Sequence, residues 1–265
     1  MSIGLRSLRF AIAIPALVLC DVSSPFTQVQ TPSTIILYAS AGAITGTRWA
    51  TVADSTAAGG AAIFNADHGD AKLVTPFAMP ASYVDLTFTA PAHVAYHLWL
   101  RMRAEGDAFT NDSVSAQFSD TVTTSGAADF RIGTTRAIAV VLEEGTNAGL
   151  SAWGWADNGY GTLGVNVQFA TTGTHTLRLQ QREDGVRIDQ VVLSPSTYLA
   201  TSPGTTKRDT TILPPNDGAS PPAPGASTLI LYASAGAITG TRWATVADST
   251  AAGGAAIFNA DHGDA

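Results

Sequence analysis

The residues with the clearest potential for chemistry lie in the stretch AWGWADNGYGTLG, residues 152–164. Aromatic rings can stack on the flat apolar faces of sugar rings, while carboxylate and amide groups hydrogen-bond to sugar hydroxyls. The stretch supplies both kinds of group at close spacing: Trp153, Trp155, Tyr160, Asp157 and Asn158. This combination predicts a carbohydrate-binding loop in which the rings stack on the ligand and the polar side chains orient it.

The two tryptophans of this stretch also allow a second interpretation. In an extended segment Trp153 and Trp155 point to the same side, and one or both could fill the space between two sheets instead of meeting a ligand. We expect one of them to be buried and the other to lie at the surface, with Tyr160 as an exposed partner.

A second polar loop, EGDAFTNDS at residues 105–113, offers Asn111 and Asp112 as further ligand contacts. The same composition is typical of an ordinary solvated turn. Both interpretations of this loop stay open from the sequence.

The sequence lacks the patterns of common catalytic sites. Glu143 and Glu144 are adjacent and would point to opposite faces of a strand, so they do not form the carboxylate pair of a glycosidase. The histidines show no metal-binding spacing, and no serine stands in a G-x-S-x-G elbow. His97 alternates with apolar residues and is expected to be a hydrogen-bonded strand histidine. We therefore expect a protein that is not an enzyme.

The elements that position these residues are predicted to be β-strands. The 265 residues are only 13% charged and are rich in β-branched and small residues, which favours short strands joined by turns. Strand patterns occur at 34–39, 48–54, 83–90, 94–105, 113–123, 130–135, 137–144, 163–171, 175–183 and 186–194. Strands at this spacing, without a sustained helical period, predict an all-β fold: an antiparallel two-sheet β-sandwich of jelly-roll type. The formal net charge of −7 argues against a nucleic-acid partner.

The dipeptide Asp184-Gly185 is a strong signal for a two-residue hairpin. It is predicted to join the last two strands of the body directly, with Arg182 and Glu183 beside it as surface charges.

The N-terminal residues 1–24 are predicted to be a signal peptide. The apolar run at 10–19 follows two arginines and is about ten residues long, whereas a membrane span needs about 20. The run ends at Cys20 in a sequence similar to a lipoprotein box, and a general cleavage site near residues 22–24 is the alternative. Both place the mature chain outside the cell, secreted or held at the cell surface by a lipid anchor, with no transmembrane segment.

The chain contains a near-perfect internal repeat. Residues Thr228–Ala265 repeat Thr34–Ala71, with Leu229 in place of Ile35 as the one difference. A proline-rich stretch at 201–226, typical of a semi-rigid spacer, separates the two copies. This predicts a module at 33–200, a linker at 201–226 and the N-terminal fragment of a second module at 227–265.

The repeated fragment has three interpretations. It could be the start of the next module in a tandem array, or an artefact of sequence assembly. Alternatively, its strands could pair with the module of another copy of the chain and build polymers by strand complementation.

Several motifs occur in an order that points to one family: DSTAAGG (54–60), YVDLTFTAPAHVAYHLWLRMRAEG (83–106), NDSVSAQF (111–118), WGW (153–155) and FATTGTHTLRLQQREDGVRIDQVVLS (169–194). Together they resemble the carbohydrate-binding modules of families 6 and 35 and their galactose-binding-like relatives. The resemblance covers nearly all of 33–200. It implies a β-sandwich that binds sugars without acting on them, and the whole unit also resembles tandem repeats of large secreted bacterial proteins.

The resemblance also implies a structural calcium ion. Members of the family hold it with acidic residues of the first strand and an aspartate of the last strand, which Asp189 matches. The first strand here, TIILYAS, carries no carboxylate. A Ca²⁺ site could be built from Asp189 with Asp54 or backbone carbonyls, or Asp189 could simply hydrogen-bond a loop.

The sequence as a whole predicts a carbohydrate-binding module that holds a secreted multidomain protein on a polysaccharide or a cell-surface glycan. The alternative is a structural or adhesive repeat that forms filaments with other copies of itself through residues 227–265.

Overall fold

The computed structural model describes residues 32–216 and two short segments, 243–247 and 255–259. The predicted signal peptide with Cys20, residues 217–226 of the predicted linker and most of the second copy lie outside the described residues. No helix in the described part of the chain is long and apolar enough to cross a membrane.

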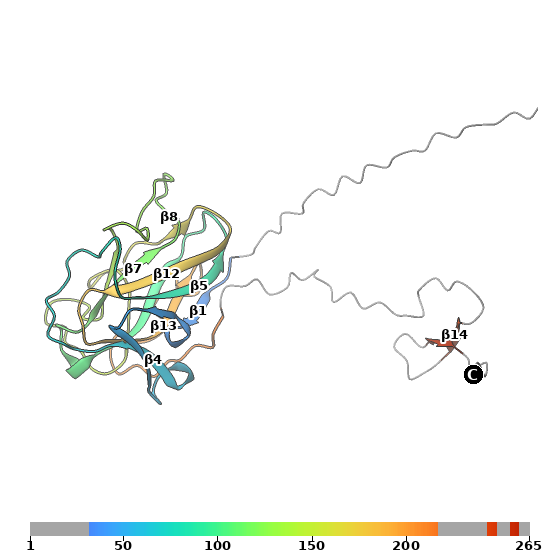
Figure 1. Cartoon of the computed structure of the whole chain (residues 1–265), viewed down its shortest axis with the longest axis horizontal. Helices are drawn as coiled ribbons and strands as arrows, with labels where there is room; N and C mark the ends of the chain where they lie inside the picture. The colour runs from blue at the N-terminus through green and yellow to red at the C-terminus, as the bar shows by residue number, and fades with distance from the viewer. Residues whose placement is uncertain (1–31, 217–242, 248–254, 260–265) are drawn as a thin grey trace, which may run out of the picture.

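The module consists of two antiparallel sheets (Figure 1). Sheet A has the order β10-β6-β13-β4-β3, and β1 also pairs with β13. Its strands are β1 (Ile35–Tyr38), β3 (Trp49–Ala53), β4 (Ala61–Asn65), β6 (His97–Ala104), β10 (Gly154–Ala156) and β13 (Val186–Ser194). Sheet B contains, in spatial order, β2 (Ala43–Thr45), β5 (Tyr83–Ala90), β12 (Gly173–Gln181), β7 (Ser113–Phe118) and β9 (Ile138–Val141). A small ribbon pairs β8 (Thr121–Val122) with β11 (Gln168–Phe169).

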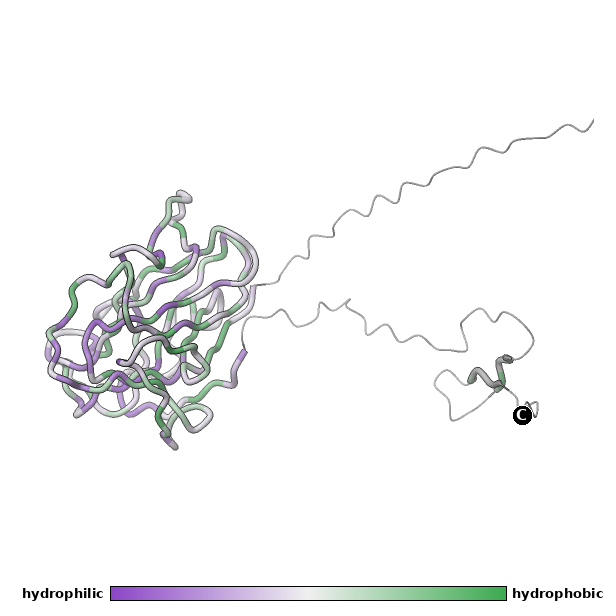
Figure 2. Tube along the Cα trace, viewed as in Figure 1, coloured by the Kyte–Doolittle hydropathy of each residue, from purple (hydrophilic) through white to green (hydrophobic). Residues whose placement is uncertain are grey.

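The core lies between the two sheets and follows from the alternation of each strand. Leu98, Leu100 and Met102 of β6 face Leu177 and Leu179 of β12 in one buried cluster. Hydrophobic and hydrophilic positions alternate along the strands (Figure 2), as a half-buried strand requires. The predicted antiparallel two-sheet β-sandwich of jelly-roll type is therefore confirmed.

Two of the predicted strands are largely absent and three short ones were missed. Residues 130–135 form turns, with one bridge from Phe118 to Arg131, and 163–171 contributes only β11. The strands β2, β4 and β10 are only three to five residues long, which is too short for a clear alternation of apolar and polar residues.

The predicted Asp184-Gly185 hairpin is wrong. β12 belongs to sheet B and β13 to sheet A, so the segment between them crosses from one sheet to the other. Glu183, which was expected to be a surface charge, is buried at 4% exposure, and the turn residue Asp184 is buried at 2%. A two-residue turn can only join strands that pair with each other, and these two strands do not.

A β-bulge in β13 sets the direction of Asp189. The pairing of β13 with β6 shifts register between Ile188 and Gln190. Ile188 and Val191 therefore both face the core, and the inserted residue Asp189 lies on the outward face of sheet A beside Arg101. An extra residue in one strand reverses the alternation after it, which is how a bulge re-aims a side chain.

The chain after β13 packs on the outward face of sheet A. Trp99 Nε1 donates to Tyr198 O at 2.7 Å, and Gln190 exchanges two hydrogen bonds with the backbone of Leu213. At the end of this segment the backbones of Ile36 and Asn216 pair at 2.6 and 2.7 Å. The body of the module therefore continues to Asn216, past the boundary predicted at residue 200, because the apolar cluster of Trp99, Trp155 and Val192 on the outward face of sheet A requires cover. We call residues 195–216 the tail.

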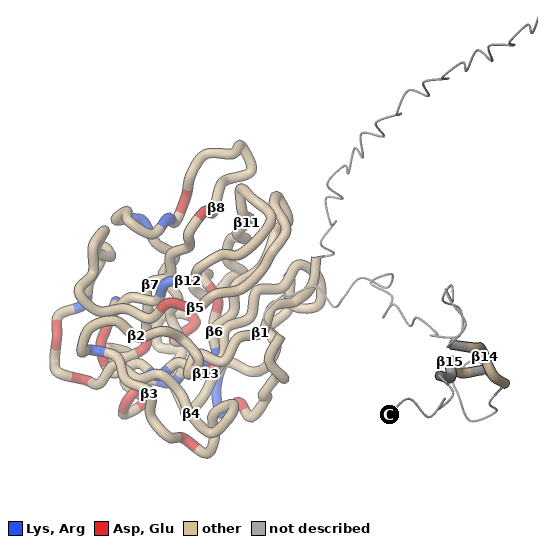
Figure 3. The backbone as a smooth tube through the Cα atoms, turned by 45° about the vertical axis from the view of Figure 1, so that its right-hand side comes forward, with Lys and Arg blue, Asp and Glu red and all other residues tan. Residues whose placement is uncertain are grey.

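The second copy forms one recognisable element. β14 (Trp243–Ala247) pairs with β15 (Ala255–Asn259), and Trp243 lies opposite Asn259 as Trp49 lies opposite Asn65 in the first copy (Figure 3). The repeated sequence thus encodes the same hairpin locally. Strand complementation between chains stays a prediction.

Candidate functional site

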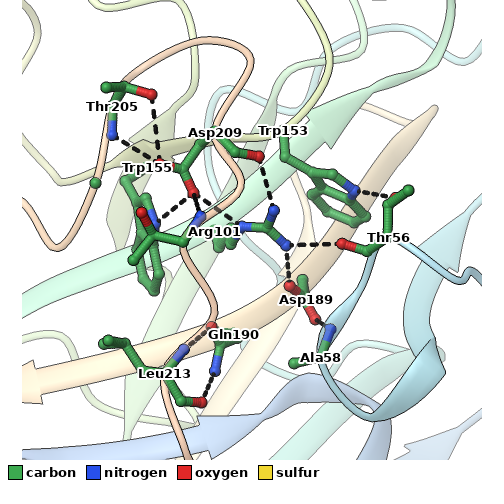
Figure 4. A network of polar contacts seen from close by, with 12 residues as sticks. Thr56, Ala58, Arg101, Trp153, Trp155, Asp189, Gln190, Thr205, Asp209 and Leu213 are labelled. Atoms are coloured by element: carbon green, nitrogen blue, oxygen red, sulfur yellow. Dashed lines mark hydrogen bonds and ion pairs between the residues drawn. The ribbon is translucent and has the colours of Figure 1, made fainter.

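Trp153 and Trp155 are both buried, at 3% and 0% exposure. Trp153 Nε1 donates to Thr56 Oγ1 at 2.8 Å, and Trp155 Nε1 donates to Asp209 Oδ1 at 3.1 Å (Figure 4). The expectation that one of them lies at the surface is therefore wrong. The tail and the turn around Thr56 cover the outward side of sheet A, so both indoles pack inside the module.

Asp157 is also a structural residue. Its Oδ2 lies 2.7 Å from His97 Nε2 and accepts from Gly164 N at 2.8 Å, while Oδ1 accepts from Gly159 N at 2.7 Å. Burial by itself would raise the pKa of Asp157, but the hydrogen bonds from His97, Gly164 and Gly159 outweigh it and hold the pKa below its usual range. Asp157 therefore fixes the 158–164 loop, and His97 is hydrogen-bonded as the sequence suggested.

Three of the predicted ligand residues do come together. Asp112, Asn158 and Tyr160 line one pocket of about 430 Å³, which we call the Tyr160 pocket. The pocket lies beside edge strand β9, between the loops that precede β7 and follow β10. Its other lining residues are Lys72, Phe109, Ala139, Val141, Glu143, Gly159 and Arg182.

The Tyr160 pocket has two exposed aromatic rings. Phe109 is 68% exposed and Tyr160 is 50% exposed. They come from loops that are far apart in sequence and share this pocket only through the fold. Phe109 was not predicted as a ligand residue, although a phenylalanine in the polar stretch EGDAFTNDS was a usable signal.

One lining residue of the pocket, Asp112, belongs to a pair of buried carboxyls. Asp112 is 1% exposed and accepts from Glu143 N at 2.8 Å, and it hydrogen-bonds with Glu183. Glu183 accepts from Ser113 Oγ at 2.5 Å and pairs with Lys72 Nζ at 2.9 Å. Burial and the contact with Glu183 raise the pKa of Asp112 to about 7. Burial would also raise the pKa of Glu183, but its bonds from Ser113 and Lys72 hold it below its usual range.

This carboxyl pair predicts that stability falls between about pH 5 and pH 7. The folded state binds a proton on Asp112 up to about pH 7, whereas the unfolded chain releases it near pH 4, so the unfolding free energy decreases as pH rises between them. At about 1.4 kcal/mol per pKa unit, the loss from pH 5 to pH 7 is on the order of 2 kcal/mol. The lowered pKa of Glu183 makes the unfolding free energy depend on pH only below about pH 4.5, outside this window.

Urea unfolding at pH 5, 6, 7 and 8 measures this slope. The Asp112→Asn variant keeps an acceptor for Glu143 N and removes the titrating group, so its stability should be nearly flat over the same range. An equal slope in both proteins would contradict the assignment to Asp112.

Asn111 and Asn158 mainly hold their own loops. Asn111 Nδ2 donates to Asp67 Oδ2 at 3.0 Å and to Glu105 O at 3.2 Å, and its side chain is 5% exposed. Asn158 Nδ2 donates to Val165 O at 3.0 Å and closes the loop that carries Tyr160. Asn158 still lines the Tyr160 pocket, whereas Asn111 does not.

Asp189 and Asp54 do not fit a calcium ion. Asp189 Oδ1 accepts from Ala58 N at 2.7 Å, and its Oδ2 is held by Arg101 Nη1 (Figure 4). Asp54 Oδ1 accepts from the backbone and side chain of Thr56, and Oδ2 lies 3.6 Å from an arginine nitrogen, Nη1 of Arg187. Each carboxylate faces a guanidinium, and the described residues contain no cluster of three His, Cys, Asp or Glu side chains suited to a metal.

No protein-family model matches the chain, and no curated protein matches it either. Among solved structures, a family 35 carbohydrate-binding module from Clostridium thermocellum aligns with a TM-score of 0.37 and 13% identity, covering 61% of this chain and 97% of that one. The C-terminal family 6 module of a marine laminarinase from Zobellia galactanivorans gives a TM-score of 0.37 and 14% identity over 61% and 98%.

The larger enzymes are matched only in part. A β-(1,4)-mannanase of Podospora anserina that carries a family 35 module aligns with a TM-score of 0.40 and 12% identity, covering 63% of this chain and 28% of the mannanase chain. With identities of 14% or less and TM-scores of 0.40 or less in these three structures, the ligand must be argued from the residues of the present chain.

Proposed function

We propose that this protein is a non-catalytic carbohydrate-binding module and that the Tyr160 pocket receives the sugar. The observation that carries the proposal is the pair of exposed rings, Phe109 and Tyr160, which line one pocket together with charged and amide side chains. Aromatic faces and planar polar groups in one hollow are what a sugar ring with its hydroxyls requires.

The polar lining suits a ligand rich in hydroxyls. A hydroxyl both donates and accepts, and the pocket offers donors on Lys72 and Arg182 and an acceptor on Glu143. The volume of about 430 Å³ lies within the range of roughly 300–1,000 Å³ typical of small-ligand pockets. It is large enough for one or two sugar rings at the end of a glycan.

The expected setting is a larger secreted or cell-surface protein. The predicted signal peptide at 1–24 supports export, and the repeated segment 227–265 supports an arrangement in tandem. A module of this kind would hold the rest of the protein on polysaccharide or on a cell-surface glycan. Filament formation through 227–265 is the alternative prediction, and glycan binding does not require it.

The full chain should be retained by at least one glycan on an array and by the corresponding polysaccharide in an affinity gel. Retention should saturate and should be released by the soluble oligosaccharide. Prolonged incubation should release no reducing sugar, because we propose binding without catalysis. Failure to bind any polysaccharide, combined with concentration-dependent polymers in sedimentation, would favour the filament alternative.

A further inference from the structure

The polar network on the outward face of sheet A contains a positive charge at its centre. Arg101 on β6 is 1% exposed, and four of its hydrogen bonds are made to three other segments of the chain (Figure 4). Its Nη1 donates to Asp189 Oδ2 on β13. The same nitrogen also donates to Thr56 O, at 3.3 Å. Its Nε and Nη2 reach Asp209 Oδ1 and Asp209 O of the tail at 3.2 and 2.9 Å.

The groups around Arg101 are the oxygen ligands that a calcium ion prefers. They are two carboxylates and two backbone carbonyls, which are hard acceptors. The guanidinium supplies the compensating charge and places donors toward all of them. The ring of Trp153 lies 5.0 Å from the guanidinium carbon and adds a cation–π contact.

We infer that Arg101 serves as a built-in cation, which joins β6, β13, the Thr56 turn and the tail and makes the stability of the module independent of calcium. Three features carry this inference. The bulge in β13 aims Asp189 at Arg101. Ala58 N and Thr205 N donate to the acceptor oxygens that Arg101 leaves on the two aspartates, and Thr211 N donates to Asp209 Oδ1 beside Arg101 Nε. The burial of Arg101 excludes the water and ions that would otherwise compete.

The same network decides how firmly the tail is held. Asp209 accepts from Trp155 Nε1, Thr205 N and Thr211 N in addition to Arg101. Without the guanidinium, the carboxylates of Asp209 and Asp189 would be buried without their cation, and the tail would detach to hydrate them. Arg208 is exposed and Lys207 half-buried in the folded module, and detachment frees the backbone beside them to enter the active site of trypsin.

The first test uses the unmodified full chain. Its melting temperature, followed by tryptophan fluorescence, should be the same in excess EDTA and in millimolar CaCl₂. A melting temperature that falls in EDTA, or rises with CaCl₂, would overturn the inference, because either result requires a cation site that contributes to folding.

The second test uses the Arg101→Ala variant. Its melting temperature should fall by about 10 °C, the shift expected when one partner of a buried ion pair is removed from a domain of this size. Methylguanidinium at low millimolar concentration should recover part of the loss, and methylammonium should not, since only the planar fork reaches both aspartates. A variant that melts like the wild type, or is rescued equally by both ions, contradicts the assignment.

Proteolysis provides a readout specific to the tail. Trypsin should cut Arg101→Ala after Lys207 or Arg208 at least tenfold faster than the wild type, as followed by mass spectrometry of the intact products. If Arg101→Ala does not fold, Arg101→Lys replaces it: the single ammonium should give a smaller drop in melting temperature and faster tail cleavage than the wild type. Unchanged cleavage in a folded variant would mean that Arg101 does not hold the tail.

Discussion

Replacing Tyr160 with alanine should weaken glycan binding by about tenfold or more, and the double replacement with Phe109→Ala should abolish retention. Burial of one large apolar side chain against a ligand contributes about 1.5–3 kcal/mol, and each 1.4 kcal/mol is a factor of about ten in affinity. At least half of each side chain is exposed to solvent, 68% for Phe109 and 50% for Tyr160. Their removal therefore costs the free protein little stability.

The chain offers a matched control for this experiment. Phe77 is 55% exposed, and it lines a different pocket, next to Arg48 and Gln180. Phe77→Ala removes the same ring from a comparable surface position and should leave the dissociation constant within about twofold. Isothermal titration with the oligosaccharide selected on the array measures all variants. Equal affinities for Tyr160→Ala and wild type, or a larger loss in Phe77→Ala, would place the binding site elsewhere.

Replacing Trp155 with alanine should destabilise the module rather than remove a ligand contact. Trp155 is fully buried, its Nε1 donates to Asp209, and Trp99, Val192 and the tail residue Leu213 belong to the same apolar cluster. Truncation of a buried tryptophan costs about 3–5 kcal/mol, and the loss of its bond to Asp209 adds to this. Chemical unfolding should show a decrease of this size.

Trp155→Phe distinguishes packing from the hydrogen bond. It keeps most of the buried ring and should lose about 1–2 kcal/mol, for the lost hydrogen bond to Asp209 and the smaller side chain. At a temperature where the variant is folded, its glycan affinity should match the wild type. A folded Trp155→Phe protein that no longer binds the glycan would indicate that Trp155 contacts the ligand.

The fold was predictable because the alternation of apolar and polar residues shows directly which side of each strand faces the core. Leu98, Leu100 and Met102 had to share a face, and that face had to be the core. The covering of the opposite face was not predictable in the same way. Trp99 and Arg101 are covered by a tail whose proline-rich composition is that of a spacer, so the contacts that enclose them leave no periodic signal in the sequence.

The candidate site was predictable only in part for the same reason. Tyr160 was correctly expected to be exposed, and Asp112 and Asn158 line its pocket. Trp153, Trp155 and Asp157 belong to the same short stretch, but β10 directs them into the module and only the loop after it reaches the surface. Glu183 was assigned to a surface turn because a local Asp-Gly signal does not show that the flanking strands enter different sheets.

The pairing of Ile36 with Asn216 has a mechanical consequence. Strand β1 at the start of the module and the end of the tail lie side by side (Figure 1), so tension applied to the two ends would not be carried through the sandwich. It would instead separate the tail from sheet A one contact at a time, beginning at the Ile36–Asn216 pair. The Arg101–Asp209 contact would meet the load only after the outer part of the tail had come away. Under a pull, a module attached to a surface would therefore lengthen before its sheets or its Tyr160 pocket were disturbed.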